Sequence, residues 1–414
     1  MTATLRKSAP VPDHVPAHLV RYFNYRTDPA FLRDPYAAID ALRETRAFWT
    51  TYEGGYWVLT RAEDIQGAMR QPDLFSNDTR VFRLLASYAS PKAKADKADL
   101  AKMLTVLDRP EHGMYRRVIA QRFMPKVIET MRPDVTAICT DLIEPLVKKG
   151  HCDFIDAFAS RFPTTVFLRL MGLPLGDSDR FLGWANKVLF GSTMEEVKAA
   201  QSQIMAYLAA VIEERSRHPS SDLISYLLAG RVEGRPITKH EVLDFCVLLF
   251  VAGLDTVATS LGLIFNYLAE HPEARQELAG HPERLPDAVE ELMRLVSPVQ
   301  QHRRVTRDVE YAGVQMKAGD ELLIFTASAS RDPEVFANAA KADLHRNPNS
   351  HTAFGAGPHI CLGIHLARQE IAVAIQEWLA RIPEFAKPAE FEPTYRGGGI
   401  IGLTRLDFEW PVNG

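Results

Sequence analysis

The sequence has 414 residues, 46% of them hydrophobic and 24% charged, which is the composition of an ordinary folded protein and excludes a disordered or collagen-like chain. The 48 basic and 52 acidic side chains give a net charge of −4, so charge gives no reason to expect nucleic acid as a partner. Four cysteines without a Cys-x-x-Cys pair exclude a disulfide scaffold and a zinc ribbon, and they favour a reducing, cytoplasmic location.

Few elements are predicted before residue 110. Residues 1–20 contain no apolar core with a cleavage site, so we expect no targeting segment. Residues 76–107 have no clear period, and we interpret them as a long loop, or a loop with one short helix, a kind of segment that usually serves a function. Caps, turn residues and alternation predict a helix from Pro35 to about Thr45, a hairpin of Phe48–Tyr52 and Tyr56–Leu59, and a short helix behind a capping box of Thr60 and Glu63.

From Glu111 to about Gly280 the pattern is almost entirely helical. The most apolar stretch, Val242–Phe265, contains Asp244 and Asp255, and charges at membrane depth are costly. We therefore predict a helix buried in a soluble protein and no membrane anchor. The remaining predicted elements are a capping box of Thr238 and Glu241, helices from Pro272 and over Pro286–Ser297, strands at Val309–Tyr311 and Glu321–Phe325, and a helix from Leu362 to about Leu379.

The sharpest motif is the run Phe-Gly-Ala-Gly-Pro-His-Ile-Cys-Leu-Gly, from Phe354 to Gly363. Its glycines and proline predict a loop, and Cys361 ends that loop directly before an amphipathic helix. A thiolate there would be stabilised by the helix N-terminus and by loop amides, which suits a ligand to haem iron. A lone cysteine is more often a buried packing residue, but the ten-residue pattern favours the ligand.

This run resembles the haem-binding loop of the cytochromes P-450, the haem-thiolate monooxygenases. The resemblance covers nearly the whole chain and is closest to the bacterial camphor-hydroxylating type. It implies a mainly α cytochrome P-450 fold, with small β-sheets and a single helix-rich domain over residues 1–414. Haem b is then held between the long central helix and the Cys361 helix, with Cys361 as the iron ligand and Phe354 in the haem-binding loop.

A second motif, Ala252-Gly253-Leu254-Asp255-Thr256, lies in the middle of the buried helix. In the interior of a buried helix, a glycine lowers helix stability and a carboxylate without partners is costly to desolvate. A threonine whose hydroxyl bonds back to the helix can loosen a turn and leave a groove. A satisfied buried polar pair is the alternative explanation. The family resemblance implies that Ala252 and Gly253 border the cofactor, that Thr256 stabilises the activated oxygen and that Asp255 helps to deliver protons.

A third motif is the Glu-x-x-Arg pair of Glu291 and Arg294, one helical turn apart. Taken alone it would be an exposed ion pair of little value. In the family the pair is buried and structural, and it helps to fix the cysteine loop. The resemblance also implies that four residues bind the haem propionates, namely His112, Arg116, Arg303 and His359. Arg304 has no such counterpart and is predicted to be a surface charge.

The family resemblance also indicates a substrate pocket, and the loop 76–107 is expected to cover it. This loop is about ten residues longer than in the camphor type, so camphor itself is not predicted. An apolar pocket of this kind would suit a small terpenoid or norisoprenoid. Under the alternative explanation, half of the expected pocket residues simply pack in the core. The expected pocket residues are Tyr88, Leu248, Val251, Val299, Ile400 and Ile401.

Residues 109–132 contain six basic and two acidic side chains, a local excess of positive charge. A solvated helix face explains this as well as a docking surface does. The family resemblance implies docking of a [2Fe-2S] ferredoxin that is served by a separate ferredoxin reductase, and we expect a monomer. The G-x-G-x-x-G pattern at residues 397–402 is followed by no helix, so it is not a dinucleotide-binding unit.

Together these features predict a haem-thiolate monooxygenase that hydroxylates a small hydrophobic substrate with O2 and two electrons. One alternative is a haem-thiolate binding or sensor protein without turnover. The other is a peroxide-driven haem enzyme. The acid–alcohol pair of Asp255 and Thr256 argues against both, because neither would need a proton-delivery step in the central helix.

Overall fold

The computed structural model describes residues 10–79, 103–191 and 193–412. Tyr88 and most of the predicted loop 76–107 therefore lie outside the described residues. The helices are α1 (Pro29–Arg33), α2 (Pro35–Leu42), α3 (Ala62–Arg70), α5 (Glu111–Ala120), α6 (Pro125–Glu129), α7 (Arg132–Val147), α8 (Arg161–Met171), α9 (Ser178–Phe190), α10 (Met194–Arg217), α11 (Leu223–Leu228), α12 (Lys239–Glu270), α13 (Pro272–Gly280), α14 (Leu285–Val296), α15 (Thr326–Ser330) and α16 (Ile364–Arg381).

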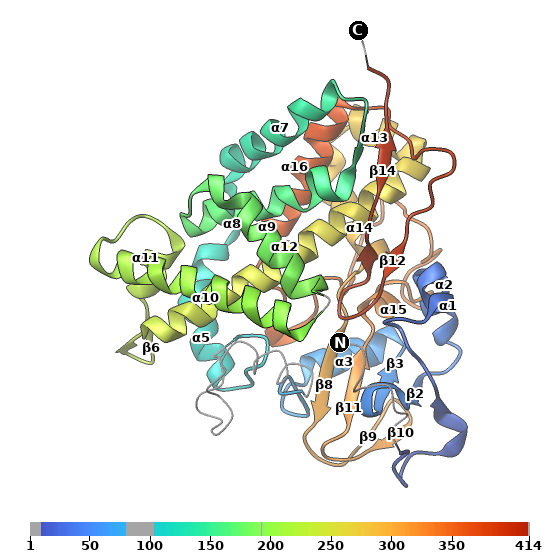
Figure 1. Ribbon diagram of the computed structural model, residues 1–414. Coiled ribbons are helices and arrows are strands. Elements are labelled where there is room, and N and C mark those ends of the chain that lie inside the picture. The colour runs from blue at the N-terminus through green and yellow to red at the C-terminus, as the bar shows by residue number, and fades with distance from the viewer. Residues whose placement is uncertain (1–9, 80–102, 192, 413–414) are drawn as a thin grey trace.

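The strands are short. They are β1 (Val20–Arg21), β2 (Ala47–Thr50), β3 (Tyr56–Leu59), β4 (Phe75–Ser76), β5 (His151–Asp153), β6 (Arg231–Val232), β7 (Arg235–Pro236), β8 (Gln301–Val305), β9 (Val309–Tyr311), β10 (Val314–Met316), β11 (Glu321–Ile324), β12 (Tyr395–Arg396), β13 (Gly402–Leu403) and β14 (Asp407–Glu409). Those of the largest sheet lie at the lower right of Figure 1, whereas β6 lies beside α11 and β14 near α13.

Helix α12 forms the centre of the helical part and runs obliquely through it, between α10 and α16 (Figure 1). Its capping box is confirmed: the Thr238 side chain accepts from the backbone N–H of Glu241, and the Glu241 carboxylate accepts from the backbone N–H of Thr238. By length and composition α12 could cross a membrane, but 72% of its most apolar window is buried by the helices around it. The prediction of a buried core helix is therefore confirmed.

The main hydrophobic core fills the space between α12, α16, α7 and α8. Trp378 of α16 has no exposed surface and packs edge-on against Phe154, with ring centroids 5.0 Å apart. Phe154 in turn stacks on Phe265 of α12, at 4.4 Å. This aromatic cluster fixes α16, the helix that follows Cys361, against the central helix.

The largest sheet has six strands in the order β1-β2-β3-β11-β8-β4. The predicted hairpin is confirmed, because β2 pairs with β3 in antiparallel register. Strand β11 inserts between β3 and β8, so segments from both halves of the chain share one sheet (Figure 1). The two strands predicted after residue 308 both exist, but β9 pairs with β10 while β11 belongs to the large sheet.

The capping box predicted at Thr60 is wrong. The Thr60 hydroxyl turns away from the helix and donates to the carbonyls of Thr45 (2.7 Å) and Arg46 (3.1 Å). The first free backbone N–H of α3, that of Ala62, donates instead to Oδ2 of Asp332 at 2.9 Å. A carboxylate distant in the sequence therefore caps this helix, and a local pattern cannot reveal such a partner.

Candidate functional site

The cysteine loop is shaped by two glycines with positive φ, Gly355 (+76°) and Gly357 (+70°). A Cβ atom at position 357 would lie 2.5 Å from the carbonyl oxygen of Met69, so only glycine fits at this contact. The backbone N–H of Cys361 donates to the carbonyl of Phe354 at 2.9 Å and closes the loop. Cys361 is thereby held just before the first turn of α16, as predicted.

Burial raises the pKa of the Cys361 thiol, while a hydrogen bond from the backbone N–H of Gly363 and the charges of Arg116 and Arg368 oppose the rise. The loop amide therefore stabilises the thiolate as predicted, but burial has the larger effect. A bound metal cation would hold the sulfur as a thiolate in this place. Burial also raises the pKa of the Cys152 thiol, to about 12, so that cysteine is a packing residue.

The four predicted propionate ligands lie together in a group of basic side chains. The rings of His112 and His359 are tilted over one another with centroids 3.8 Å apart. Burial and the neighbouring Arg116 lower the pKa of His112 to about 4. Burial, His112 and Arg303 lower the pKa of His359 to about 2. Nε2 of His112 is buried and has no hydrogen-bond partner among the described residues.

Arg303 is 3% exposed, and burial lowers the pKa of its guanidinium to about 10. It donates to the carbonyl of His302 (2.8 Å) and to Oε1 of Gln301 (2.7 Å). In the described part of the chain no carboxylate forms an ion pair with this guanidinium. A buried cation without an acid partner is costly, so this cluster is suited to an anionic ligand.

Asn77 and Asp108 support this cluster, and no local motif predicts either role. The Asn77 side-chain amide lies 2.9 Å from Nε2 of His359, and the backbone N–H of Asn77 donates to Asp108 at 2.9 Å. Arg304, predicted to be a surface charge, is half-buried and pairs with Asp78 at 3.1 Å.

The middle of α12 carries an open stretch in an otherwise buried helix. Ala252 and Gly253 are exposed, and Val251 is 42% exposed. A Cβ atom at Gly253 would meet no atom within 4 Å. This side of the helix therefore offers room for a flat ligand.

Asp255 and Thr256 lie on α12 just after this open stretch. The Thr256 hydroxyl donates to the carbonyl of Ala252 at 2.7 Å, and the helix stays continuous through this turn, so the predicted loosening does not occur. Oδ1 of Asp255 accepts from Nη2 of Arg396 at 2.7 Å. Oδ2 of Asp255 is buried and has no partner among the described residues. No local pattern in the sequence predicts this role of Arg396.

The Glu291–Arg294 pair has no exposed side-chain surface. Arg294 donates to both carboxylate oxygens of Glu291, at 2.7 and 2.8 Å, and to the backbone carbonyls of Ser330, Ala339 and Lys341. The pair thus joins α14 to the long segment that leads to the cysteine loop. It is buried, as the resemblance implies, and touches no open part of the site.

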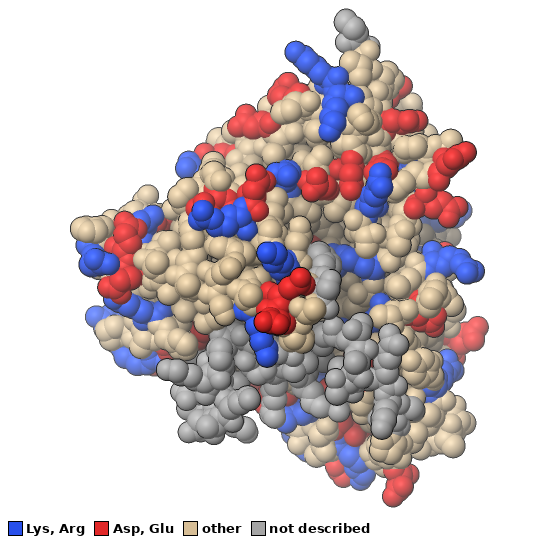
Figure 2. Space-filling model, viewed as in Figure 1, with Lys and Arg blue, Asp and Glu red and all other residues tan. Residues whose placement is uncertain are grey.

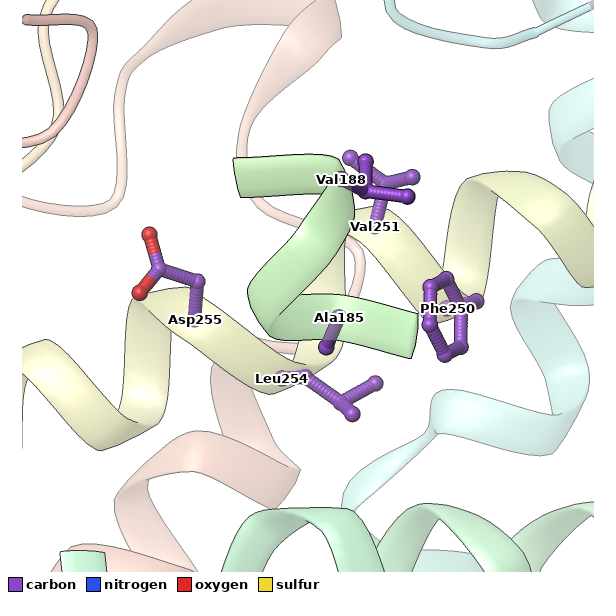
Figure 3. Close-up of a pocket in the computed structure, with 6 residues that line it drawn as sticks. All are labelled: Ala185, Val188, Phe250, Val251, Leu254 and Asp255. Atoms are coloured by element: carbon purple, nitrogen blue, oxygen red, sulfur yellow. The ribbon is translucent and has the colours of Figure 1, made fainter. Parts of the chain in front are cut away.

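A small apolar hollow lies between α9 and α12, and it is lined by Ala185, Val188, Phe250, Val251, Leu254 and Asp255 (Figure 3). In Figure 3 the apolar side chains gather on one side and the Asp255 carboxylate projects on the other. Val251 is thus the predicted pocket residue that lines this hollow.

The other predicted pocket residues within the described ranges lie elsewhere. Val299 and Ile400 are half-buried and form an isolated antiparallel bridge. Leu248 packs in the main core, at 8% exposure, and Ile401 packs in a separate aromatic cluster with no exposed surface.

These groups fit haem b. Its iron would bind the sulfur of Cys361, its propionates would meet His112, Arg116, Arg303 and His359, and its flat ring would pass the open stretch of α12. The helices α12 and α16 contact each other, so a group between them would touch both. The fold and this site together define a haem-thiolate protein.

Comparisons with known proteins agree. The sequence model of the family described as Cytochrome P450 matches residues 83–280 and 283–393. A relative from Sinorhizobium fredii, "Probable cytochrome P450 127A1", is 35% identical over 98% of both chains. The "Methyl-branched lipid omega-hydroxylase" of Mycobacterium tuberculosis is 32% identical over 88% of both chains. The chain belongs to the cytochrome P450 family.

Solved structures are similar as well. The structure titled "Crystal Structure of CYP101J2" has a TM-score of 0.87 and 33% sequence identity, and the alignment covers 98% of this chain and all of the other. The predicted family, mainly α fold, haem cofactor and monooxygenase class are thereby confirmed. Assignment to the camphor-hydroxylating group stays a prediction.

Proposed function

We propose that this cytochrome P450 hydroxylates a small hydrophobic substrate of the terpenoid or norisoprenoid class. The observation that carries this proposal is the pair of Asp255 and Thr256 beside the open stretch of α12, next to an apolar hollow. A protein that only holds or senses haem would need neither a carboxylate with an unpaired oxygen nor an adjacent hydroxyl at this place.

The residues divide the work. Bound haem supplies an iron that activates O2 with two electrons and two protons. Cys361 would hold the iron through its sulfur, and the basic side chains around His112 and Arg303 would orient the ring through its propionates. Oδ2 of Asp255 has no hydrogen-bond partner to displace, so it can take up a proton and release it toward the Thr256 hydroxyl. The apolar side chains around Val251 exclude water and hold the substrate near these groups.

The apolar lining supports the proposed substrate class. Five of the six side chains around the hollow are hydrocarbon, and Asp255 is the sixth. The hollow itself is small, and the predicted covering loop lies mostly outside the described residues. A relative whose name states that it hydroxylates methyl-branched lipid is consistent with a hydrophobic substrate.

Electrons are proposed to come from a [2Fe-2S] ferredoxin with a separate reductase. Arg109 and Lys126 are exposed on or beside α5 and α6, Arg117 is exposed and pairs with Glu233 at 2.6 Å, and Met124 is 55% exposed. Exposed basic side chains in this segment suit an acidic partner, because complementary charge speeds encounter. On the face seen in Figure 2, acidic and basic side chains lie interspersed. We further propose a cytoplasmic monomer.

The test is the variant Thr256→Ala, assayed with a bacterial [2Fe-2S] ferredoxin, its reductase and β-ionone as a norisoprenoid probe. We expect product formed per NADH consumed to fall about tenfold and hydrogen peroxide to rise, because proton delivery is impaired. Thr165→Ala is a matched control, since the Thr165 hydroxyl also bonds back to its helix, to Arg161 at 2.9 Å, but on α8. Unchanged coupling in Thr256→Ala would contradict the proposed role.

A spectroscopic measurement checks the ligand independently of turnover. The reduced, carbonyl-bound protein should show the red-shifted Soret band of thiolate ligation. Cys361→Ala should lose this band, whereas Cys139→Ala should keep it, because Cys139 is a fully buried packing residue. A wild-type spectrum without the band would reject Cys361 as the ligand.

A further inference from the structure

The Asp255 side chain is hydrogen-bonded within a group of three polar side chains. Nη2 of Arg396 donates to Oδ1 of Asp255 at 2.7 Å and to the hydroxyl oxygen of Thr259 at 2.6 Å. The Thr259 hydroxyl itself lies 3.4 Å from the same Oδ1. The side chains of Asp255 and Arg396 are 8% and 18% exposed, so water competes little for these bonds.

The backbone is built to bring Arg396 to this place. Arg396 ends β12 and pairs with Gly402 of β13, and β13 packs against α12. A Cβ atom at Gly402 would lie 2.7 Å from Cγ2 of Thr259 and 3.3 Å from Nε of Arg396. Only glycine allows so close an approach, so the position of the strand and the position of the guanidinium depend on the same contact.

We propose that Arg396 is a positioning residue for the proton-delivering carboxylate of Asp255. The inference rests on the proposed function and deepens it. Arg396 donates to Oδ1 of Asp255 and so fixes the rotation of this carboxylate, while Oδ2 of Asp255 has no partner among the described residues. Without the guanidinium, the carboxylate would turn to satisfy both oxygens, and Oδ2 would lose its fixed direction.

In the proposed mechanism, Asp255 takes up one proton and releases one proton in each transfer. A proton that arrives at Oδ2 of Asp255 converts the carboxylate to the acid, and its departure toward the oxygen site restores the carboxylate. Arg396 takes no part in the proton transfer. Its part is therefore orientation and charge balance, and it need not touch substrate or cofactor.

The first test compares Arg396→Gln, Asp255→Asn and the double variant in the haem-loaded protein, with β-ionone and a [2Fe-2S] ferredoxin system. We expect Arg396→Gln to lower kcat about tenfold, with an unchanged dissociation constant for β-ionone in the spin-shift titration. In the Asp255→Asn background, Arg396→Gln should have no further effect, because both substitutions then remove the same function. Equal losses in both backgrounds would overturn the proposal.

Two further variants separate positioning from general damage. Arg396→Lys keeps one cationic donor for Oδ1 and should restore most of the lost kcat. Arg405→Gln is the control, because Arg405 lies on the same C-terminal segment, is 65% exposed and pairs with Asp407. It should behave as the wild type. Failure of Arg396→Lys to restore any activity, with an intact fold, would contradict the role of the cationic donor.

A crystal structure of Arg396→Gln gives a readout that does not depend on activity. We expect the Asp255 carboxylate to rotate or to occupy two conformers; a carboxylate that keeps its wild-type position would overturn the proposal. If the wild-type protein fails to hydroxylate β-ionone, the proposed function fails for this substrate class. The position of Asp255 in the variant still decides whether Arg396 orients it, so the two failures are distinguishable.

Discussion

At the scale of single residues, the most unusual acid outside the site is Glu370. It lies within α16, is 3% exposed, and its Oε2 has no hydrogen-bond partner among the described residues. Burial raises the pKa of this carboxyl to about 8. Glu370 is therefore a neutral acid at pH 7, inside the helix that follows the iron ligand.

This burial predicts a pH dependence of stability. An unfolded glutamate has a pKa of about 4.3, so between about pH 4.3 and pH 8 the unfolded chain has lost a proton that the folded chain keeps. The free energy of unfolding should then fall as pH rises, by up to about 1.4 kcal/mol per pH unit from this group. Above pH 8 both states are ionised and the slope from Glu370 vanishes.

Glu370→Gln should remove that slope. Urea unfolding of the haem-loaded wild type and variant, at about pH 6 and about pH 8, measures the difference. The variant should gain stability relative to the wild type at the higher pH, because a neutral amide of similar size replaces a carboxyl that must ionise. Parallel pH profiles for the two proteins would show that Glu370 does not titrate in this range.

At the scale of elements, the buried Glu291–Arg294 pair joins α14 to the chain on the way to the cysteine loop. Glu291 accepts from the backbone N–H of Asp343, at 2.8 Å, and from the side chains of Arg346 and Asn349. Arg294 occupies three carbonyls on the same segment. These two side chains, one helical turn apart, thus provide hydrogen-bond partners for many polar groups of residues 330–349, a segment with little regular structure of its own.

Arg294→Ala should destabilise the fold by about 3–5 kcal/mol, because it leaves Glu291 as a buried, partly compensated charge. The comparison is Arg132→Ala, which breaks an exposed pair with Glu129 at the same spacing and should cost less than about 1 kcal/mol. Denaturant midpoints and haem content per protein report the difference. Similar losses for the two variants would show that burial does not govern the strength of this pair.

At the scale of the whole molecule, the site draws on distant parts of the chain. His112 lies on α5, Thr256 on α12, Arg303 on β8 and Cys361 before α16. Since haem must touch all four, binding should couple the helical part to the sheet. We therefore propose that residues 1–414 form one cooperative domain.

This proposal predicts a single unfolding transition for the haem-loaded protein. The Soret band, far-UV circular dichroism and tryptophan fluorescence should share one midpoint. Trp49 and Trp57 lie in the sheet and the other three tryptophans in the helical part, so a variant with both Trp49→Phe and Trp57→Phe reports the helical part alone. Two separate midpoints would divide the chain into independent units.

The sequence predicts local features well and distant partnerships poorly. The cysteine loop and the capping box at Thr238 are encoded within a few residues, and both occur as predicted. The cap of α3 by Asp332 and the pairing of Asp255 with Arg396, 141 residues away, depend on how separate segments pack. Ile401 shows the same limit, because its apolar side chain suits a pocket wall or a core equally and the structure places it in the core.

The six-stranded sheet also constrains the order in which the protein can assemble. Trp57 of β3 pairs with Leu322 of β11, so the ribosome must complete most of the chain before this strand finds its neighbour. Until then, β3 presents an open edge to which other chains can add. Arg303, on the strand beside β11, reaches its place at the same late stage. Haem capture during synthesis must therefore wait for the last quarter of the chain, and fragments that end before β8 should aggregate.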